Sequence, residues 1–292
     1  MKHKIYFFVV SAVVLLMTAC DSQDVTSLDS SKTREITFSM ETIQLSGNTP
    51  MRAPTRATAP VLAPSCLLVL DELNGSIVSA NTVERTVDAL TPLTMNLTYG
   101  DHTLYFLACK NSYASFNTTD MTVTWGGAEH KLNYVWVAKK VIHVDESTAA
   151  ADAVTLDLAV AQVQVECNDA FPANTRDMRI QAPSACWTLN LRTLQGVVGE
   201  VVSTADVSAH AGKTGRSLGL FTFVPVSGNI GDVTLTVYNN AATPQALATH
   251  TLEDVPVRVG YVSHYIGLFF SHDKSFSFSY ENEWRGTDEY TY

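Results

Sequence analysis

The sequence predicts an all-β protein made of two tandem β-sandwich domains that follow an amino-terminal export signal. Apolar residues alternate with polar ones in segment after segment, which is the pattern of strands with one buried face. Turn-forming pairs such as Asn74-Gly75 and Gly126-Gly127 separate these segments. No long stretch after the signal has the apolar spacing of an amphipathic helix. Two domains of ordinary size account for the length of the chain.

The expected strands can be placed one after another along the chain. The clearest alternation predicts strands at residues 36–45, 65–71, 121–125, 163–167, 233–237 and 276–280. Two runs are apolar on both faces, as in central strands, and they are Leu104–Cys109 and Phe221–Val226. The Ala-rich stretch 145–152 is interpreted as the link, so the domains are expected at 35–150 and 151–292.

The first 20 residues have the three parts of a secretory signal. Residues 2–4 are basic, Ile5–Met17 is apolar apart from Ser11, and the small pair Thr18-Ala19 leads into Cys20. A helix that spans a bilayer needs about 20 apolar residues, and this run is shorter. We therefore expect residues 1–19 to be a cleaved signal peptide and the mature protein to be exported.

The residues around the expected cleavage point carry a resemblance of their own. Met17-Thr-Ala-Cys20 resembles the lipobox of bacterial lipoproteins, although that family usually has leucine in place of Met17. The resemblance implies that Cys20 carries acyl chains, palmitate among them, that hold the protein in a membrane. Residues 20–34 are polar and rich in Ser and Asp, which is typical of a tether after such an anchor.

Charge and cysteine content limit the function classes further. The net charge is −10, with 29 acidic against 19 basic residues, and this balance argues against binding nucleic acid. Beyond Cys20 the chain has Cys66, Cys109, Cys167 and Cys186. An exported protein can hold disulfides, and the simplest pairing is 66–109 and 167–186. The apolar surroundings of three of the four slightly favour buried thiols instead.

The sequence has no motif for catalysis or metal binding in the context that such a motif requires. Gly215-Arg-Ser217-Leu-Gly219 matches the nucleophile elbow of hydrolases, but a strand-like run follows it where that motif needs a helix. The eight histidines are scattered without the spacing of a metal site. We therefore expect no enzymatic activity, no cofactor and no metal.

The four tryptophans leave a second function open. Their rings could stack on sugars, which would suit a surface protein that captures glycans for a nutrient-uptake system. Trp125 and Trp136 lie in alternating segments, where packing in the core is the more common role.

The composition of the loop between the first two expected strands predicts that this loop is exposed. Residues 46–60 contain three prolines, one glycine and many small polar residues. Arg52 and Arg56 lie in it, and each is followed by alanine. A protease specific for arginine would find both bonds accessible.

Three passages resemble the fimbrillin superfamily of Gram-negative oral and gut anaerobes, and in particular the FimB-type minor or anchor subunits. The resemblance covers most of the chain, and its motifs are degenerate and hydrophobic. The passages are Leu93–Ala108, Val154–Glu166 with the following Phe171-Pro172, and Phe276–Gly286.

The resemblance implies transthyretin-like sandwiches and assembly by strand exchange. In that family's stalk subunits, cleavage after the first strand frees this strand, and a strand of the next subunit fills the groove. Carried over to this chain, Arg52 or Arg56 would be the cleavage site. The departing plug strand would contain Ile36, Phe38 and Met40.

The same resemblance leaves two roles open within a fimbria. Anchor-type members stay lipidated and uncut at the filament base, and the length and ending of this chain favour an anchor or minor subunit, whereas its two arginines favour a cleavable one. The expected partners are other fimbrial subunits, the outer membrane through the lipid on Cys20, and a host or bacterial surface ligand. Residues expected to pair near the subunit interface are Phe276, Phe278 and Tyr280.

Overall fold

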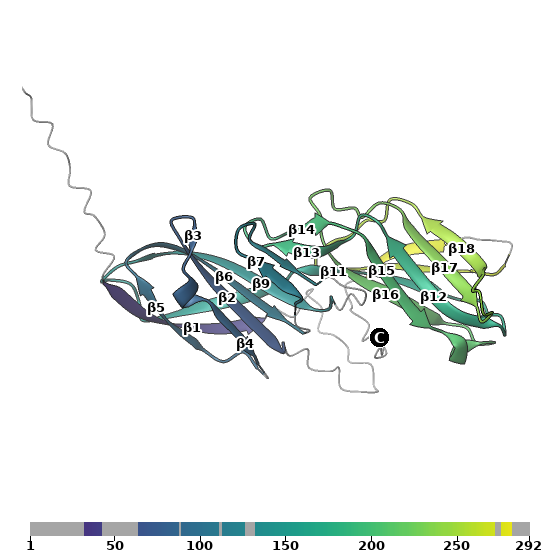
Figure 1. Ribbon diagram of the computed structural model, residues 1–292, viewed down its shortest axis with the longest axis horizontal. Helices are drawn as coiled ribbons and strands as arrows, with labels where there is room; N and C mark the ends of the chain where they lie inside the picture. The colour runs from purple at the N-terminus through teal and green to yellow at the C-terminus, as the bar shows by residue number, and fades with distance from the viewer. Residues whose placement is uncertain are drawn as a thin grey trace, which may run out of the picture.

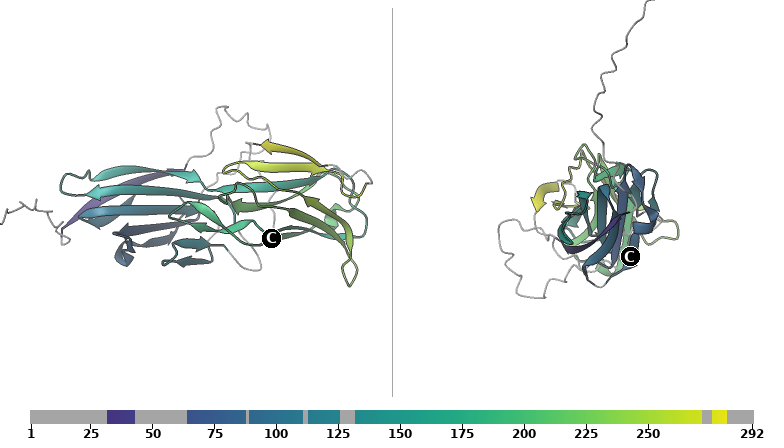
Figure 2. Two further views of the ribbon diagram at one scale, coloured as in Figure 1. Left: turned by 90° about the horizontal axis from the view of Figure 1, so that it is seen from above. Right: turned by 90° about the vertical axis from the view of Figure 1, so that its left-hand side faces the viewer.

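The structure is a computed structural model that describes residues 32–42, 64–87, 89–110, 113–125, 132–271 and 276–281. Its regular secondary structure is almost entirely strand, and the strands run along the length of an elongated molecule (Figure 1). Figure 2 shows from above and end-on that the strands of each half are stacked in layers. Two hydrophobic cores lie between these layers, one after the other along the molecule. The predicted fold class, tandem β-sandwiches, is confirmed.

The described residues of the first half form ten strands and one short 3₁₀ helix, η1 (Ser79–Asn81). The strands are β1 (Thr33–Thr42), β2 (Cys66–Leu73), β3 (Ser76–Ile77), β4 (Val83–Thr86), β5 (Leu93–Thr98), β6 (Gly100–Cys109), β7 (Ser115–Asn117), β8 (Thr122–Thr124), β9 (Val135–Val144) and β10 (Ala151–Leu158).

In the second half, the part of the chain that the structure describes forms ten further strands and η2 (Ser208–His210). The strands are β11 (Val160–Cys167), β12 (Thr175–Ala182), β13 (Cys186–Asn190), β14 (Gln195–Val198), β15 (Val201–Asp206), β16 (Arg216–Phe223), β17 (Val233–Asn239), β18 (Ala246–Leu252), β19 (Val262–Gly267) and β20 (Phe276–Glu281).

The first sandwich is formed mainly by one eight-stranded sheet that turns back on itself, and the four-stranded sheet β14-β13-β8-β7 also contributes side chains to its core. The strand order is β3-β2-β6-β9-β10-β1-β5, and β4 pairs with β2. The turn is at β10, which pairs with β1 along most of its length and with β9 through only Asp157 and Leu158. Phe38 of β1 therefore faces Phe106 of β6 across the core, with ring centroids 5.6 Å apart.

The second sandwich consists of two four-stranded sheets, β16-β11-β19-β20 and β15-β12-β17-β18. Alternate residues of β11, β12 and β17 meet between the sheets. This agrees with the period of two that predicts strands at 163–167 and 233–237. β16 differs from the prediction, because it lies at the edge of its sheet and ends at Phe223, before Pro225. Its run is apolar on both faces because Phe221 and Phe223 also enter the first core, at the junction of the two halves.

The two halves are joined without a linker. The stretch 145–152, interpreted above as a link, contains the turn from β9 to β10 and the first two residues of β10, and the Asp145 side chain accepts hydrogen bonds from Ser147 and Thr148 within the turn. β10 then continues into β11 with only Ala159 between them. In addition, the β13–β14 hairpin of the second half pairs with β8 of the first. Backbone pairing thus crosses the position expected for the domain boundary.

Candidate functional site: the slot of the first strand

The first strand lies between two others in the sheet and is hydrogen-bonded to both. β1 runs parallel to β10, in register from Thr37 with Ala151 to Thr42 with Leu156. On its other side it runs antiparallel to β5, in register from Thr33 with Thr98 to Phe38 with Leu93. The space that β1 occupies between β10 and β5 is called the β1 slot below.

The plug residues expected from the sequence all point into the core. Ile36 and Phe38 are fully buried and Met40 is 8% exposed, while Ser39 and Glu41 between and beside them are exposed. Buried residues of the neighbouring strands complete this face of the slot, and they are Leu93, Met95 and Leu97 of β5 and Val154, Leu156 and Leu158 of β10. A buried apolar side chain contributes about 1.5–3 kcal/mol, so the three plug residues account for about 5–9 kcal/mol.

Polar contacts fix the register of β1 on its outer face. Arg34 Nε donates to the carbonyl oxygen of Thr148 at 3.0 Å, and the hydroxyls of Thr37 and Thr94 are 2.9 Å apart. Thr155 donates to Glu41 at 3.2 Å. If β1 left the sheet, β10 and β5 would each present a row of unpaired backbone groups beside an apolar groove. Such an edge binds another strand readily.

Several of the predicted site residues lie outside the described residues. These are Cys20, Arg52 and Arg56, together with most of the tether 20–34 and the whole loop 46–60. The described part of the chain resumes at residue 64, directly before β2. No helix in the described residues is both long and apolar enough to cross a membrane.

Beside the slot, a buried ion pair crosses from β2 to β6. The carboxylate of Asp71 is 2.7 Å from His102 Nδ1, and both side chains are fully buried. Nε2 of His102 donates to the carbonyl oxygen of Thr98, the last residue of β5, at 2.8 Å. Burial alone lowers the pKa of His102, but the hydrogen bond and charge of Asp71 outweigh burial and raise that pKa above its ordinary value. The two ring nitrogens of His102 thus contact Asp71 and Thr98, and the ring connects β2, β6 and the end of β5.

A second polar group attaches the β13–β14 hairpin to the first sandwich. Arg192, in the turn of that hairpin, donates to Glu72 of β2 at 2.7 Å, and Tyr105 of β6 donates to the other oxygen of the same carboxylate. Burial raises the pKa of Glu72, but the hydrogen bonds from Tyr105 and Arg192 outweigh burial and lower it. Lys139 of β9 donates to the carbonyl oxygen of Arg192 at 3.0 Å. The two halves are thus joined by side chains as well as by backbone.

The carboxyl-terminal strand pairs where the sequence predicts a strand. β20 runs antiparallel to β19, with Phe276 opposite Gly267 and Phe278 opposite Tyr265, and it forms the edge of its sheet. The chain before it is held by Asp169, whose carboxylate accepts backbone hydrogen bonds from residues 269–271 at 2.7–3.1 Å. Phe276, Phe278 and Tyr280 are thus in an edge strand of the second sandwich, apart from the plug residues in the first.

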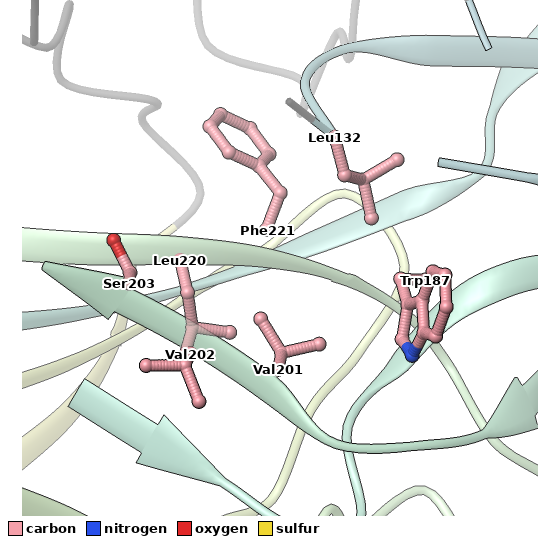
Figure 3. A pocket seen from close by; sticks show the side chains of 7 residues that line it. All are labelled: Leu132, Trp187, Val201, Val202, Ser203, Leu220 and Phe221. Atoms are coloured by element: carbon pink, nitrogen blue, oxygen red, sulfur yellow. The ribbon is translucent and has the colours of Figure 1, made fainter. Parts of the chain in front are cut away.

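The tryptophans described here do not form a platform for sugars. Trp125 and Trp136 are 3% and 2% exposed, which confirms their predicted role in the core. Trp136 stacks on Tyr134 at 6.0 Å, but that tyrosine is buried too. Trp187 lines a small apolar pocket at the junction of the halves, with room for about one water molecule. Figure 3 shows its lining, in which Ser203 supplies the hydroxyl group.

The serine of the hydrolase-like motif lies in a strand. Ser217 is the second residue of β16, opposite Glu166 of β11, and its Oγ accepts a hydrogen bond from the Gln164 amide at 3.1 Å. A nucleophile elbow requires a sharp turn from a strand into a helix, and here the strand continues to Phe223. Among the described residues, no three His, Cys, Asp or Glu side chains are grouped so as to hold a metal ion.

Known proteins resemble this chain in fold and not in sequence. No family model matches the chain, and no curated protein matches its sequence. A protein of Bacteroides ovatus provisionally described as an adhesin matches with a TM-score of 0.53 at 10% identity, over 86% of this chain and 97% of that one. This chain has the same fold as that protein.

Two further solved structures extend this comparison. A Bacteroides thetaiotaomicron protein provisionally described as polysaccharide-binding matches with a TM-score of 0.51 at 10% identity, over 80% of this chain and 92% of that one. The fimbrial anchor protein Mfa2 from Porphyromonas gingivalis matches with a TM-score of 0.47 at 11% identity, over 86% and 98% of the two chains. At that score Mfa2 adds nothing to the assignment of the fold.

Proposed function

We propose that this protein is a fimbrial subunit lipoprotein of the outer membrane, an anchor or minor subunit that joins other subunits by β-strand exchange. It serves adhesion and has no enzymatic role. The observation that carries the proposal is the position of β1, which is paired on both sides and fills an apolar slot with three side chains. The lipobox-like sequence before β1 supports the membrane anchor, and the fold shared with an adhesin-like protein supports the surface role.

The order of segments along the chain gives the proposal a mechanism. Cys20 precedes β1, and the two loop arginines follow it. Cleavage after Arg52 or Arg56 would therefore leave β1 joined to the lipid, while the rest of the chain would be held to β1 only by pairing and packing. A strand from another subunit could then replace β1 and release the body of the protein from the membrane.

Without cleavage, the same order produces an anchor. The loop between β1 and β2 keeps the lipid, β1 and the two sandwiches in one covalent chain. An uncut subunit remains at the membrane, where its second sandwich and the edge strand β20 are available to neighbouring subunits. The presence or absence of the cut thus decides between the two roles.

The test is the intact mass and amino-terminal sequence of the protein from cells, with the outer membrane compared with sheared surface material. An acylated Cys20 terminus in the membrane, together with co-purifying filaments, would support an anchor. A terminus at Ala53 or Ala57 in sheared material of high mass would support a cleaved, polymerising subunit. A lipidated monomer without filament partners in either fraction would contradict the proposal.

The alternative is a surface lipoprotein that binds glycans, and one neighbour of the same fold favours it by its description. It requires aromatic rings exposed on one face, whereas Trp125 and Trp136 are in the core. Retention of the full chain on polysaccharide in an affinity gel, weakened by Trp187→Ala, would support the alternative. Migration at the same rate with and without polysaccharide would remove it.

A further inference from the structure

Two cysteines face each other across the β2–β6 pair. Cys66 is the first residue of β2, Cys109 is the last residue of β6, and the two are directly opposite in the antiparallel register. Residues opposite each other in such a pair have Cα atoms about 4.5–5.5 Å apart. A disulfide spans about 4.4–6.8 Å between Cα atoms, so the backbone is already at the right separation.

The backbone around the pair is held on both sides. Cys66 also lies opposite Thr86 of β4, and Cys109 lies opposite Val135 of β9. Beyond the pair, Ser65 N donates to the carbonyl oxygen of Cys109 at 2.8 Å, and Lys110 N donates to that of Tyr134 at 2.9 Å. Four strands therefore fix the two cysteines in register.

The remaining two cysteines have other surroundings, which makes them a matched control. Cys167 donates to the Asp169 carboxylate at 3.0 Å and belongs to the second core, whereas Cys186 belongs to the first. Burial raises the pKa of both thiols. The pairing 167–186, considered above on sequence grounds, is not favoured by this arrangement.

The two facing thiols differ in acidity. The thiol of Cys109 hydrogen-bonds to Cys66, which lowers the pKa of Cys66 and raises that of Cys109. Thiolates are the reactive form in disulfide exchange. Cys66 is 6% exposed and Cys109 fully buried, so Cys66 is the thiol that an oxidant meets first.

We propose that Cys66 and Cys109 form a disulfide in the exported protein. The inference rests on the export that the proposed function includes, because oxidising compartments lie outside the cytoplasm. The oxidant is a disulfide of a protein or small molecule. The Cys66 thiolate attacks one sulfur of that disulfide and releases the other as a thiolate. Cys109, having lost its proton, then attacks the Cys66 sulfur and releases the second thiolate, so the oxidant ends as a dithiol.

The bond would tie together two strands that do not pair with the plug strand but lie in the facing part of the sheet. β1 pairs with β10 and β5, whereas the disulfide joins β2 to β6. Emptying the β1 slot removes one row of core side chains and both of its strand pairings. The β2–β6 disulfide would keep the facing half closed while the slot is open.

The test counts thiols in the full chain purified from the outer membrane in detergent. The protein is denatured in an alkylating reagent without reductant, and its mass and peptide map are measured. A parallel sample is reduced, unfolded and refolded in a glutathione redox buffer before the same count. The expected result in both samples is two alkylated thiols, Cys167 and Cys186, and one linked peptide that contains Cys66 and Cys109.

Variants separate the bond from a general loss of folding. Reductant should lower the unfolding midpoint of the wild type and of Cys167→Ser/Cys186→Ser by about 5 °C or more, and should leave Cys66→Ser/Cys109→Ser unchanged. Four alkylated thiols in the refolded sample would overturn the proposal, whatever the state of the protein in cells. The same mass spectra detect the lipid on Cys20 independently of the disulfide. Absence of that lipid from a disulfide-bonded protein would therefore count against the proposed function alone.

Discussion

Replacing the central plug residue, Phe38→Ala, tests how strongly β1 is integrated into the first sandwich. Phe38 is fully buried, and its ring meets that of Phe106 edge-on at 5.6 Å and 62°. Removing such a side chain costs about 3–5 kcal/mol in transfer and cavity terms, of which the ring pair supplies about 0.5–1.5 kcal/mol. At about 2–4 °C per kcal/mol, the melting midpoint of the variant should fall by about 6–20 °C.

The assay is thermal and urea unfolding of the variant beside Ser39→Ala. Ser39 is the next residue of β1, is exposed, and makes only a 3.3 Å hydrogen bond to the carbonyl oxygen of Asp152. Its removal should change the free energy of unfolding by about 0.5 kcal/mol at most. A double-mutant cycle with Phe106→Ala should return a coupling of about 0.5–1.5 kcal/mol. Equal stability of Phe38→Ala and Ser39→Ala would refute the placement of β1 in the core.

Three further predictions concern polar side chains that join strands and loops. Asp71→Ala should lower the free energy of unfolding by about 3–5 kcal/mol, because it removes the carboxylate partner of the buried His102 ring. The pKa of His102 is raised, so its stabilisation is complete below the unfolded value of about 6.5 and is lost as the pH rises through the folded value. Urea unfolding between pH 5.5 and 9 should show this loss in the wild type, and an equal slope in Asp71→Ala would contradict it. Arg192→Met should lower the free energy of unfolding only slightly, since the Arg192 side chain is 43% exposed and water screens its charge. The pKa of Glu72 is lowered, so its stabilisation is complete above about pH 4.3 and is lost as the pH falls through its folded pKa. The free energy of unfolding should therefore fall less at acid pH in Arg192→Met than in the wild type. Asp169→Asn should cost about 1–3 kcal/mol and speed amide exchange in residues 269–271, and unchanged exchange there would show that the carboxylate is dispensable.

The sequence predicts most of the strands because one face of each is buried. The alternation through Ile36, Phe38 and Met40 is reproduced in β1, and the doubly apolar run 104–109 is the central strand β6. The type of a strand can be read from its own residues in this way, since a side-chain period of two needs no knowledge of neighbours.

Pairing between strands that are distant in the chain could not be predicted from the sequence in this way. The partners of β1 are β5 and β10, and the second begins more than 100 residues later in the chain. Their buried rows, such as Met95 and Val154, show the same alternation as any other strand, so nothing local marks them as the walls of one slot. The link expected at 145–152 depends on distant pairing in the same way, because a polar turn between strands and a polar linker share their composition. The buried Asp71–His102 pair was not predicted, because each residue is a single polar position in an apolar run. Nothing in either run indicates that the two side chains face each other.

The central claim for a cleaved subunit, that β1 leaves its slot when subunits assemble, can be tested by locking β1 in place. Thr37 of β1 and Thr94 of β5 are directly opposite with hydroxyls 2.9 Å apart, so Thr37→Cys/Thr94→Cys places two cysteines within reach of a disulfide. The matched control is Thr124→Cys/Thr188→Cys, an opposed pair of β8 and β13 with hydroxyls 3.0 Å apart that does not involve β1.

The measurement is the amount of each variant in the sheared fimbrial fraction of cells, with the cross-link verified by peptide mapping. Strand exchange predicts that the β1–β5 lock keeps the protein out of this fraction, that Thr37→Ser/Thr94→Ser restores it, and that the β8–β13 lock has no effect. Equal incorporation of the two locked proteins would contradict the account.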